Sequence, residues 1–256
     1  MKGVFTNLLI IFSILLIGCS TIQKIDSKLV QNNFDKVYVK TSNFELLTCQ
    51  KINKPGAILR IYIEGDGNAW KTRTVLSDDP TPRNPLALYL AMEDSSQNIV
   101  YIARPGQFPK DGYEKVDSVY WSDKRFAKEV IESFNEVIDK IKKNAKANKI
   151  ELIGYSGGGG IAVLVASGRN NVVSIRTVAG NLDHQALCKY HKASLLEGSL
   201  NPIDYAIRVK DIPQRHFVGS KDNIVPPFIV HASSNIIFYG FYIMVCFAFY
   251  HFNIFI

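Results

Sequence analysis

A serine between glycines is the residue of this sequence best suited to covalent chemistry. The stretch GYSGG at 154–158 follows the apolar segment 150–153 and precedes the apolar segment 158–167. We expect a strand, a very sharp turn and a helix, because only glycine two residues either side of the serine avoids Cβ clashes. Such a turn exposes the Ser156 hydroxyl at a helix N-terminus, where the dipole favours negative charge. Ser156 is therefore the predicted nucleophile. The alternative, a dinucleotide-binding loop, lacks the G-x-G-x-x-G register here.

An attacking serine also needs two N–H groups that bind the oxyanion of the tetrahedral intermediate. We expect the first from Gly157. The predicted strand at 57–63 runs into the loop EGDGNAW at 64–70, which we expect to supply the second. The N–H of Asp66 is the first choice and that of Gly67 the second. A plain β-turn is the alternative interpretation of this loop.

A carboxylate that orients a histidine base is predicted at Asp222. The segment GSKDNIVP at 219–226 directly follows a predicted strand at 216–218. An aspartate there holds an imidazole in the correct tautomer and stabilises its charged form. The alternative is an aspartate in a solvated turn.

The sequence does not assign the base. One histidine begins a predicted strand and is expected in the core, one comes too soon after Asp222, one lies in a polar stretch and one is near the site on another loop. The fifth lies 29 residues after Asp222, a plausible spacing, but in a segment without loop character. In that order they are His216, His231, His191, His184 and His251.

Alternating strands and helices must position these residues. Alternation with short connections predicts a mostly parallel sheet with helices on both faces. The clearest helix has apolar residues recurring at three and four, with Ser122 and Asp123 as its expected cap. The expected strands are 37–39, 44–49 (a hairpin with the first), 57–63, 99–103, 150–153, 172–178 and 216–218, and the expected helices are 85–92, 123–147 and 158–167.

The motifs together resemble the α/β-hydrolase superfamily, and strings such as IYIEGDGNAW, TVAGNLDH and HFVGSKDNIVPP are similar to a group of proteobacterial lipoprotein hydrolases. The resemblance covers about residues 36–230. It implies an α/β-hydrolase fold and a serine hydrolase of the esterase, lipase or thioesterase kind, acting on an ester or amide through a Ser-His-Asp mechanism. The alternatives are a degraded, non-catalytic relative and a membrane-tethered binding module with an idle pocket.

The N-terminus is typical of an exported lipoprotein. A basic start and an apolar run at 8–17 lead to Leu16-Ile17-Gly18-Cys19, which resembles the bacterial lipobox. We expect residues 1–18 to be a signal peptide, Cys19 to carry lipid and residues 19–35 to be an irregular tether. A chance cysteine after an ordinary signal is the alternative. The implied location is the bacterial cell envelope, with the domain anchored to a membrane and facing the periplasm or exterior.

The end of the chain departs from the resemblance. All charged residues lie at or before Asp222, and the last 34 positions have none. We interpret residues 231–256 as an atypical apolar tail from a frame shift or truncation, and we expect the last strand to be absent. A membrane-spanning helix at 236–256 and an unusual final helix and strand are the alternatives.

Composition limits cofactors and partners. With 47% apolar and 21% charged residues and a net charge of +7, the chain suits one soluble domain. The basic run at 124–149 is interpreted as a solvated helix face, so no nucleic acid is expected. The four cysteines show no zinc spacing, and neither a metal nor an organic cofactor is expected. The expected partners are a small-molecule or lipid ester and a membrane.

Overall fold

The computed structural model of the 256-residue chain describes residues 20–110, 115–230 and 241–246. The chain divides into two compact units, residues 1–35 and 36–256. The described part of the first unit begins with helix α2 (Ser20–Gln31). The expectation that this segment is irregular was wrong, because Ile22, Ile25 and Leu29 recur at the spacing of a helix face. That residues 19–35 act as a tether stays a prediction. Cys19 and the predicted signal lie outside the described residues.

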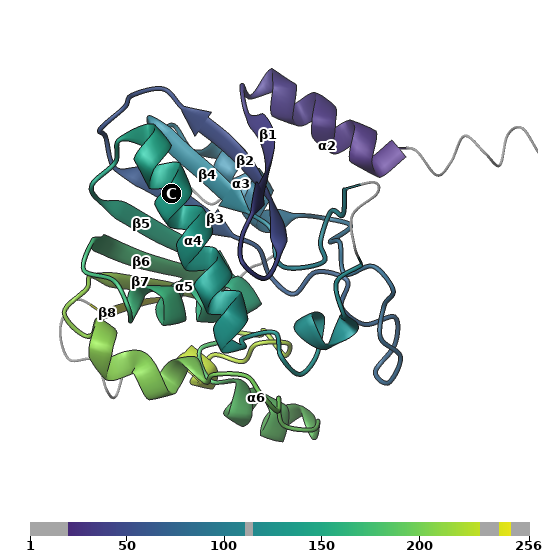
Figure 1. Cartoon of the computed structure of the whole chain (residues 1–256). Coiled ribbons are helices and arrows are strands. Elements are labelled where there is room, and N and C mark those ends of the chain that lie inside the picture. The colour runs from purple at the N-terminus through teal and green to yellow at the C-terminus, as the bar shows by residue number, and fades with distance from the viewer. Residues whose placement is uncertain (1–19, 111–114, 231–240, 247–256) are drawn as a thin grey trace, which may run out of the picture. The chain divides into compact units, whose positions relative to one another are not determined.

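The second unit is built on an eight-stranded sheet of order β1-β2-β4-β3-β5-β6-β7-β8 (Figure 1). Strand β2 is antiparallel to β4, and the strands from β4 to β8 in this order run parallel. The sheet is thus mostly parallel, as predicted. The strands are β1 (Asp35–Lys40), β2 (Glu45–Ile52), β3 (Leu59–Ile63), β4 (Asn98–Ile102), β5 (Ile150–Tyr155), β6 (Val172–Val178), β7 (Gln214–Gly219) and β8 (Phe241–Cys246).

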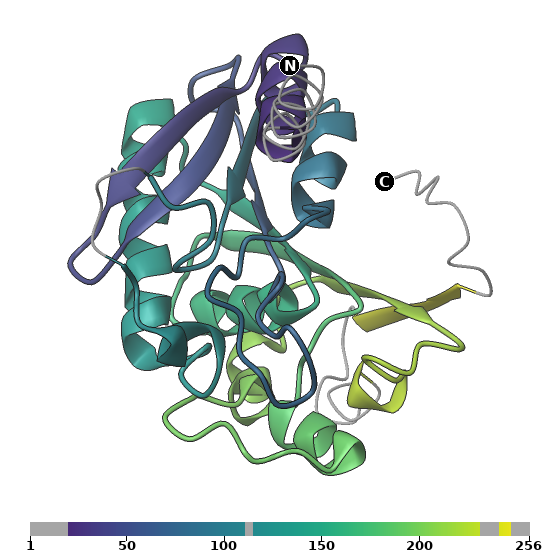
Figure 2. The same cartoon turned by 90° about the vertical axis from the view of Figure 1, so that its right-hand side faces the viewer.

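Helices cover both faces of the sheet, which confirms the predicted layers (Figures 1 and 2). Helices α4 (Lys128–Ala145) and α5 (Gly157–Ala166) pack on one face, and α3 (Leu86–Glu93) packs on the other, against β3 and β4. The main core lies between α4, α5 and the sheet, and Phe134 and Val137 are fully buried in it. Helix α6 (His184–His191) and the 3-10 helices η1 (Ser118–Trp121) and η2 (Pro202–Val209) were not predicted.

Helix α4 begins five residues later than expected, and its predicted cap was wrong. Ala127 is the N-cap, and Ser122 and Asp123 lie in the preceding turn. Long-range contacts hold that turn: Arg104 Nη2 donates to the Arg125 carbonyl, and the Phe126 N–H donates to Ser199 Oγ. These contacts take the backbone groups that an earlier start of the helix would need.

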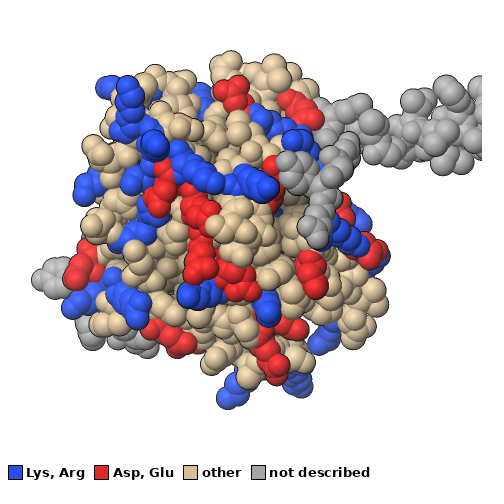
Figure 3. All heavy atoms as spheres, in the orientation of Figure 1, with Lys and Arg blue, Asp and Glu red and all other residues tan. Residues whose placement is uncertain are grey.

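The polar side of α4 is a solvated face, as the basic run predicted. Its buried residues follow one stripe, and its lysines and glutamates lie on the other side. Figure 3, in the orientation of Figure 1, shows positive and negative side chains intermixed on the face of the molecule that carries α4. This face therefore does not present a field of one sign.

The last strand is present, so the prediction that it would be absent was wrong. Strand β8 pairs parallel with β7 from Gln214↔Phe241 to Gly219↔Cys246, at the edge of the sheet (Figure 2). Its sequence, FYIMVC, is rich in the β-branched and aromatic residues that favour strands. A helix through residues 241–246 is thereby ruled out. Of the helices within the described ranges, none is long and apolar enough to cross a bilayer.

Candidate active site

Ser156 lies at a strained turn between β5 and α5. Its backbone angles are φ 51° and ψ −119°, a conformation that non-glycine residues rarely adopt. The turn is held by the Ser156 N–H, which donates to the Val178 carbonyl at 2.9 Å, and by the Ser156 carbonyl, which accepts the Asn181 N–H at 3.0 Å. The strain is thus set by bonds to the next strand along the sheet and to the loop that follows it.

The glycines of the motif are required by close packing. A Cβ at Gly154 would lie 2.2 Å from the Gly158 carbonyl oxygen, and a Cβ at Gly158 would lie 2.2 Å from the Ile63 carbonyl oxygen. Both separations are far shorter than a van der Waals contact. The packing confirms the sequence argument for glycine two residues before and after Ser156.

The loop after β3 lies directly against this turn. A Cβ at Gly65 would be 3.1 Å from Ser156 Cβ, and one at Gly157 would be 2.2 Å from Asp66 Oδ1. Gly67 has a positive φ of 66°, and its Cα faces the Pro80 carbonyl instead. Within the described parts of the chain, the N–H groups of Gly157 and Asp66 have no hydrogen-bond acceptor. The structure therefore brings together Ser156, Gly157 and Asp66, with two free N–H groups beside the serine.

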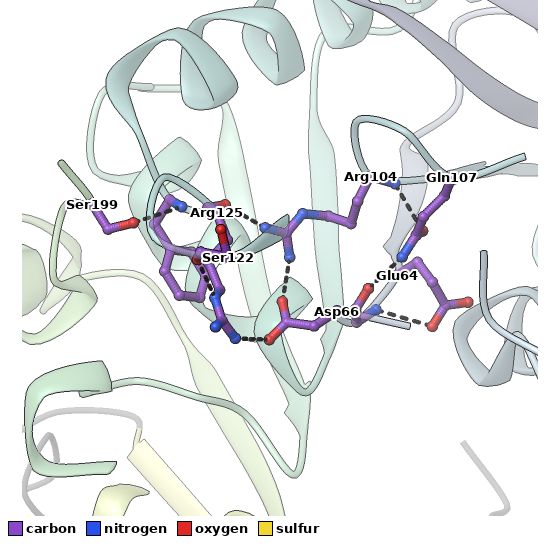
Figure 4. A network of polar contacts seen from close by, with 9 residues as sticks. Glu64, Asp66, Arg104, Gln107, Ser122, Arg125 and Ser199 are labelled. Carbon is purple, nitrogen blue, oxygen red and sulfur yellow. Dashed lines mark hydrogen bonds and ion pairs between the residues drawn. The ribbon is translucent and has the colours of Figure 1, made fainter. Parts of the chain in front are cut away.

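Two neighbours fix the backbone of this loop. Glu64 Oε1 accepts the Gly65 N–H at 3.0 Å, and Gln107 Nε2 donates to the Gly65 carbonyl at 3.0 Å (Figure 4). Burial raises the pKa of Glu64 to about 7, and the Gly65 N–H acts in the opposite direction. The N–H and the carbonyl oxygen of Gly65 are thus each held by a neighbouring side chain.

The Asp66 carboxylate is held between two arginines (Figure 4). Its Oδ1 lies 3.1 Å from Arg104 Nη1, and its Oδ2 lies 2.8 Å from Arg125 Nη1. Burial raises the pKa of Asp66, but the two guanidinium groups outweigh burial, so the net shift is downward. Burial lowers the pKa of Arg104, and the negative charge of Asp66 offsets part of this decrease. Asp66 is consequently ionised at neutral pH.

Asp222 lies on the loop after β7, at the same edge of the sheet as Ser156. Strands β5 and β7 are separated by β6, which corresponds to about 10 Å at ordinary strand spacing. Tyr155 of the serine turn packs against an apolar cluster that includes Val225 of the Asp222 loop. Burial raises the pKa of Tyr155 most, followed by the charges of Glu64 and then Asp222. The two loops therefore lie at the same edge of the sheet, one strand apart.

The Asp222 side chain is oriented by its own loop. Its Oδ1 accepts the N–H groups of Ile224 at 2.8 Å and Val225 at 3.0 Å. Its Oδ2 has no hydrogen-bond partner among the residues that the structure describes. One carboxylate oxygen is therefore fixed, and the other is open to a histidine.

The three described histidines have other contacts. His184 is buried and stacks on Phe126, with ring centroids 5.8 Å apart. His191 Nε2 donates to the carbonyl of Ile224 at 2.8 Å, so it contacts the Asp222 loop through main chain. His231 and His251 lie outside the described residues.

His216 is a buried histidine of the sheet, as expected for a strand residue. Its Nδ1 lies 2.7 Å from Thr177 Oγ1 and its Nε2 lies 3.2 Å from Gln214 Oε1. Burial lowers the pKa of His216 to about 3. His216 is therefore neutral at ordinary pH and structural.

A separate cavity of about 620 Å³ opens beside the turn between β1 and β2. Its wall includes the aromatic residues Tyr38, Phe44 and Trp121, and it does not include Ser156 or Asp222. The cavity is thus not part of the site around the serine.

Sequence reasoning missed the two arginines. Arg104 comes two residues after β4 ends, and polar residues just past parallel strands meet at one edge of the sheet, so a signal for it existed. Arg125 was assigned to a helix, and no local pattern marks it as a partner of Asp66. The ion pairs join residues 38 and 59 positions apart in the sequence.

The sheet topology, the two helical layers and the serine turn together define the α/β-hydrolase fold. In that fold the chain is similar to the acylaminoacyl peptidase of Pyrococcus horikoshii, with a TM-score of 0.58 and 16% identity over 83% of this chain. The chain spans only 36% of that peptidase.

Two smaller proteins show the same likeness over most of their own length. An alpha-beta serine hydrolase homologue from Coxiella burnetii has a TM-score of 0.54 at 16% identity, over 82% of this chain and 86% of that one. An esterase of Pyrococcus furiosus has a TM-score of 0.57 at 14% identity, over 84% and 81%. No protein-family model and no curated protein sequence matches the chain.

Proposed function

We propose that this chain is a serine hydrolase that cleaves an ester, thioester or amide with Ser156 as its nucleophile. The observation that carries the proposal is the φ of 51° at Ser156, on a turn beside two N–H groups, those of Gly157 and Asp66, that find no acceptor among the described residues. Strain of this kind costs about 1–3 kcal/mol and persists where a site needs it. The likeness to an esterase and a peptidase supports hydrolysis of an ester or amide.

In the proposed reaction, Ser156 Oγ adds to the substrate carbonyl and passes its proton to a histidine. The carbonyl oxygen takes the negative charge and accepts hydrogen bonds from the Gly157 and Asp66 N–H groups. The leaving group departs with the proton, and water then releases the acyl group from Ser156. Asp222 orients the histidine through its open Oδ2. His251 is the candidate base, on the ground of its spacing from Asp222.

The most direct test of this function is covalent labelling with a fluorophosphonate probe. The wild-type chain should be labelled on Ser156, and Ser156→Ala should remove the label. Asp222→Asn and His251→Ala should each slow labelling by at least tenfold, because both residues belong to the proposed triad. A folded chain that takes no label would support the rival function, a non-catalytic domain or binding module.

We also propose that the protein acts in the bacterial cell envelope on a small-molecule or lipid ester, anchored by lipid on Cys19. The lipobox-like sequence before Cys19 supports this location. In a bacterial host, Cys19→Ala should yield an uncleaved precursor that no longer partitions with membranes. Normal cleavage, mass and partition of this variant would contradict the anchor, without bearing on the hydrolase.

A further inference from the structure

An ionic cluster with an excess of positive charge lies next to Ser156. It consists of Asp66, Arg104 and Arg125, whose two ion pairs measure 3.1 and 2.8 Å. One carboxylate and two guanidinium groups leave a net charge of +1. The Arg104 side chain is only 4% exposed and that of Arg125 15%, so water screens these charges weakly.

The cluster lies against the proposed oxyanion donors. A Cβ placed on Gly157 would be 2.2 Å from Asp66 Oδ1 and 3.1 Å from Arg104 Nη1. One carboxylate oxygen and one guanidinium nitrogen thus occupy the side of Gly157 on which a Cβ would lie, and the N–H of Gly157 is the first proposed donor. The second proposed donor is the N–H of Asp66 itself.

The Asp66 carboxylate lies where it would oppose an oxyanion, and the two arginines counter its negative charge. If the Asp66 carboxylate lay beside Gly157 without a positive partner, it would repel the negative charge that forms on the substrate oxygen. The two guanidinium groups outnumber the Asp66 carboxylate. Glu64, whose pKa burial raises to about 7, carries a full negative charge only above that pH. Both guanidinium groups are fixed in place by further bonds: Arg104 Nη2 donates to the Arg125 carbonyl, and Arg125 Nε donates to the Ser122 carbonyl at 2.8 Å.

We propose that Arg104 and Arg125 are positioning residues that over-compensate the Asp66 carboxylate and so stabilise the oxyanion beside Gly157. This inference rests on the proposed function. When Ser156 Oγ bonds to the carbonyl carbon, the carbonyl π pair moves to oxygen and the Oγ proton leaves to a base. The net positive charge of the cluster favours that oxygen in its ionised form.

The charge of an oxyanion in this site can be measured with 1,1,1-trifluoroacetone. Ser156 Oγ adds reversibly to its carbonyl, and the proton moves from Oγ to the carbonyl oxygen, giving a hemiketal. The fluorine NMR shift of the adduct, followed against pH, reports the pKa of the hemiketal hydroxyl. A lower pKa means stronger stabilisation of the oxyanion.

The inference predicts shifts of opposite sign for opposite charge changes. Arg125→Met should raise the hemiketal pKa by about one unit, a tenfold change in ionisation, and Arg125→Lys should stay near the wild type. Asp66→Asn should lower it. Arg215→Met removes the same charge from an exposed residue at the other end of β7, and should leave the pKa unchanged.

A purely structural role would move the hemiketal pKa in one direction for both Arg125→Met and Asp66→Asn, because both break the same ion pair. Such a result, or no shift for Arg125→Met, would overturn the inference while leaving the proposed function intact, since the adduct itself shows a reactive Ser156. Absence of any wild-type adduct would overturn both.

Discussion

At the scale of single residues, the site depends on residues whose backbone conformation and size are fixed by their neighbours. Ser156 keeps a positive φ because bonds to Val178 and Asn181 hold it, and the neighbouring glycines leave space for carbonyl oxygens and for Asp66. Side chains and backbone here are so closely packed that one added methyl group should lower the free energy of unfolding.

Gly157→Ala tests this packing. The new Cβ would meet Asp66 Oδ1 at 2.2 Å, and one of the two must shift. We expect a free energy of unfolding lower by about 1–3 kcal/mol and fluorophosphonate labelling at least tenfold slower. Gly168→Ala is the matched control, because its Cβ would meet only the Val165 carbonyl, at 4.0 Å. Labelling of the Gly157→Ala variant at the wild-type rate would show that the contact is not needed.

His216 should make stability depend on pH. In the folded protein its pKa is about 3, whereas a histidine in the unfolded chain titrates near 6.5. Between these values the unfolded state binds more protons, so the free energy of unfolding falls as the pH falls through this window. From pH 7.5 to pH 5 the loss is about 2 kcal/mol.

The measurement is chemical denaturation at pH 7.5 and pH 5 for the wild type and His216→Gln. Glu64, whose raised pKa of about 7 acts in the opposite direction, is common to both proteins and cancels in the difference. The variant should lose less stability on acidification than the wild type. Equal losses would mean that His216 is not held neutral.

At the scale of elements, the sequence predicted mainly the helices and strands whose apolar residues recur with a clear spacing. Strand β6 was predicted residue for residue as 172–178, and the strand, turn and helix around Ser156 were found to within two residues. Short 3-10 helices carry no period, and α6 begins at a cap on Asp183 that did not stand out in a polar segment. The start of α4 failed because bonds from distant Arg104 and Ser199 hold the residues before it.

Strand β8 was missed because the absence of charged residues after Asp222 led us to interpret the end of the chain as an atypical tail. Strand β8 pairs with six residues of β7. Without β8, the backbone N–H and C=O groups of β7 would be exposed at the edge of the sheet. A chain ending after Val230 should therefore unfold at lower denaturant concentration and self-associate, as seen by denaturation and size-exclusion chromatography. A truncated chain with an unchanged midpoint would show that residues 231–256 contribute nothing to the fold.

At the scale of the whole molecule, the site is assembled from loops at one edge of the sheet, and this determines what the sequence could predict. Ser156, Gly157, Asp66 and Asp222 were predicted because each follows a recognisable strand. Arg125 was not, because it reaches Asp66 only through the folded arrangement. The base was left open because no histidine combines a suitable spacing from Asp222 with a loop setting, and the hydrogen bonds and ring stacking observed for the described histidines involve neither Ser156 nor the Asp222 side chain.

The central claim is that Ser156 is an activated nucleophile, and acyl transfer from p-nitrophenyl acetate tests it most directly. The chain should release nitrophenolate, and peptide mapping of the acid-quenched reaction should place the acetyl group on Ser156. Ser156→Ala should abolish both the adduct and the release above that of the heat-unfolded chain. Equal release from Ser156→Ala and the wild type, or acetyl groups found only on lysines, would contradict the account.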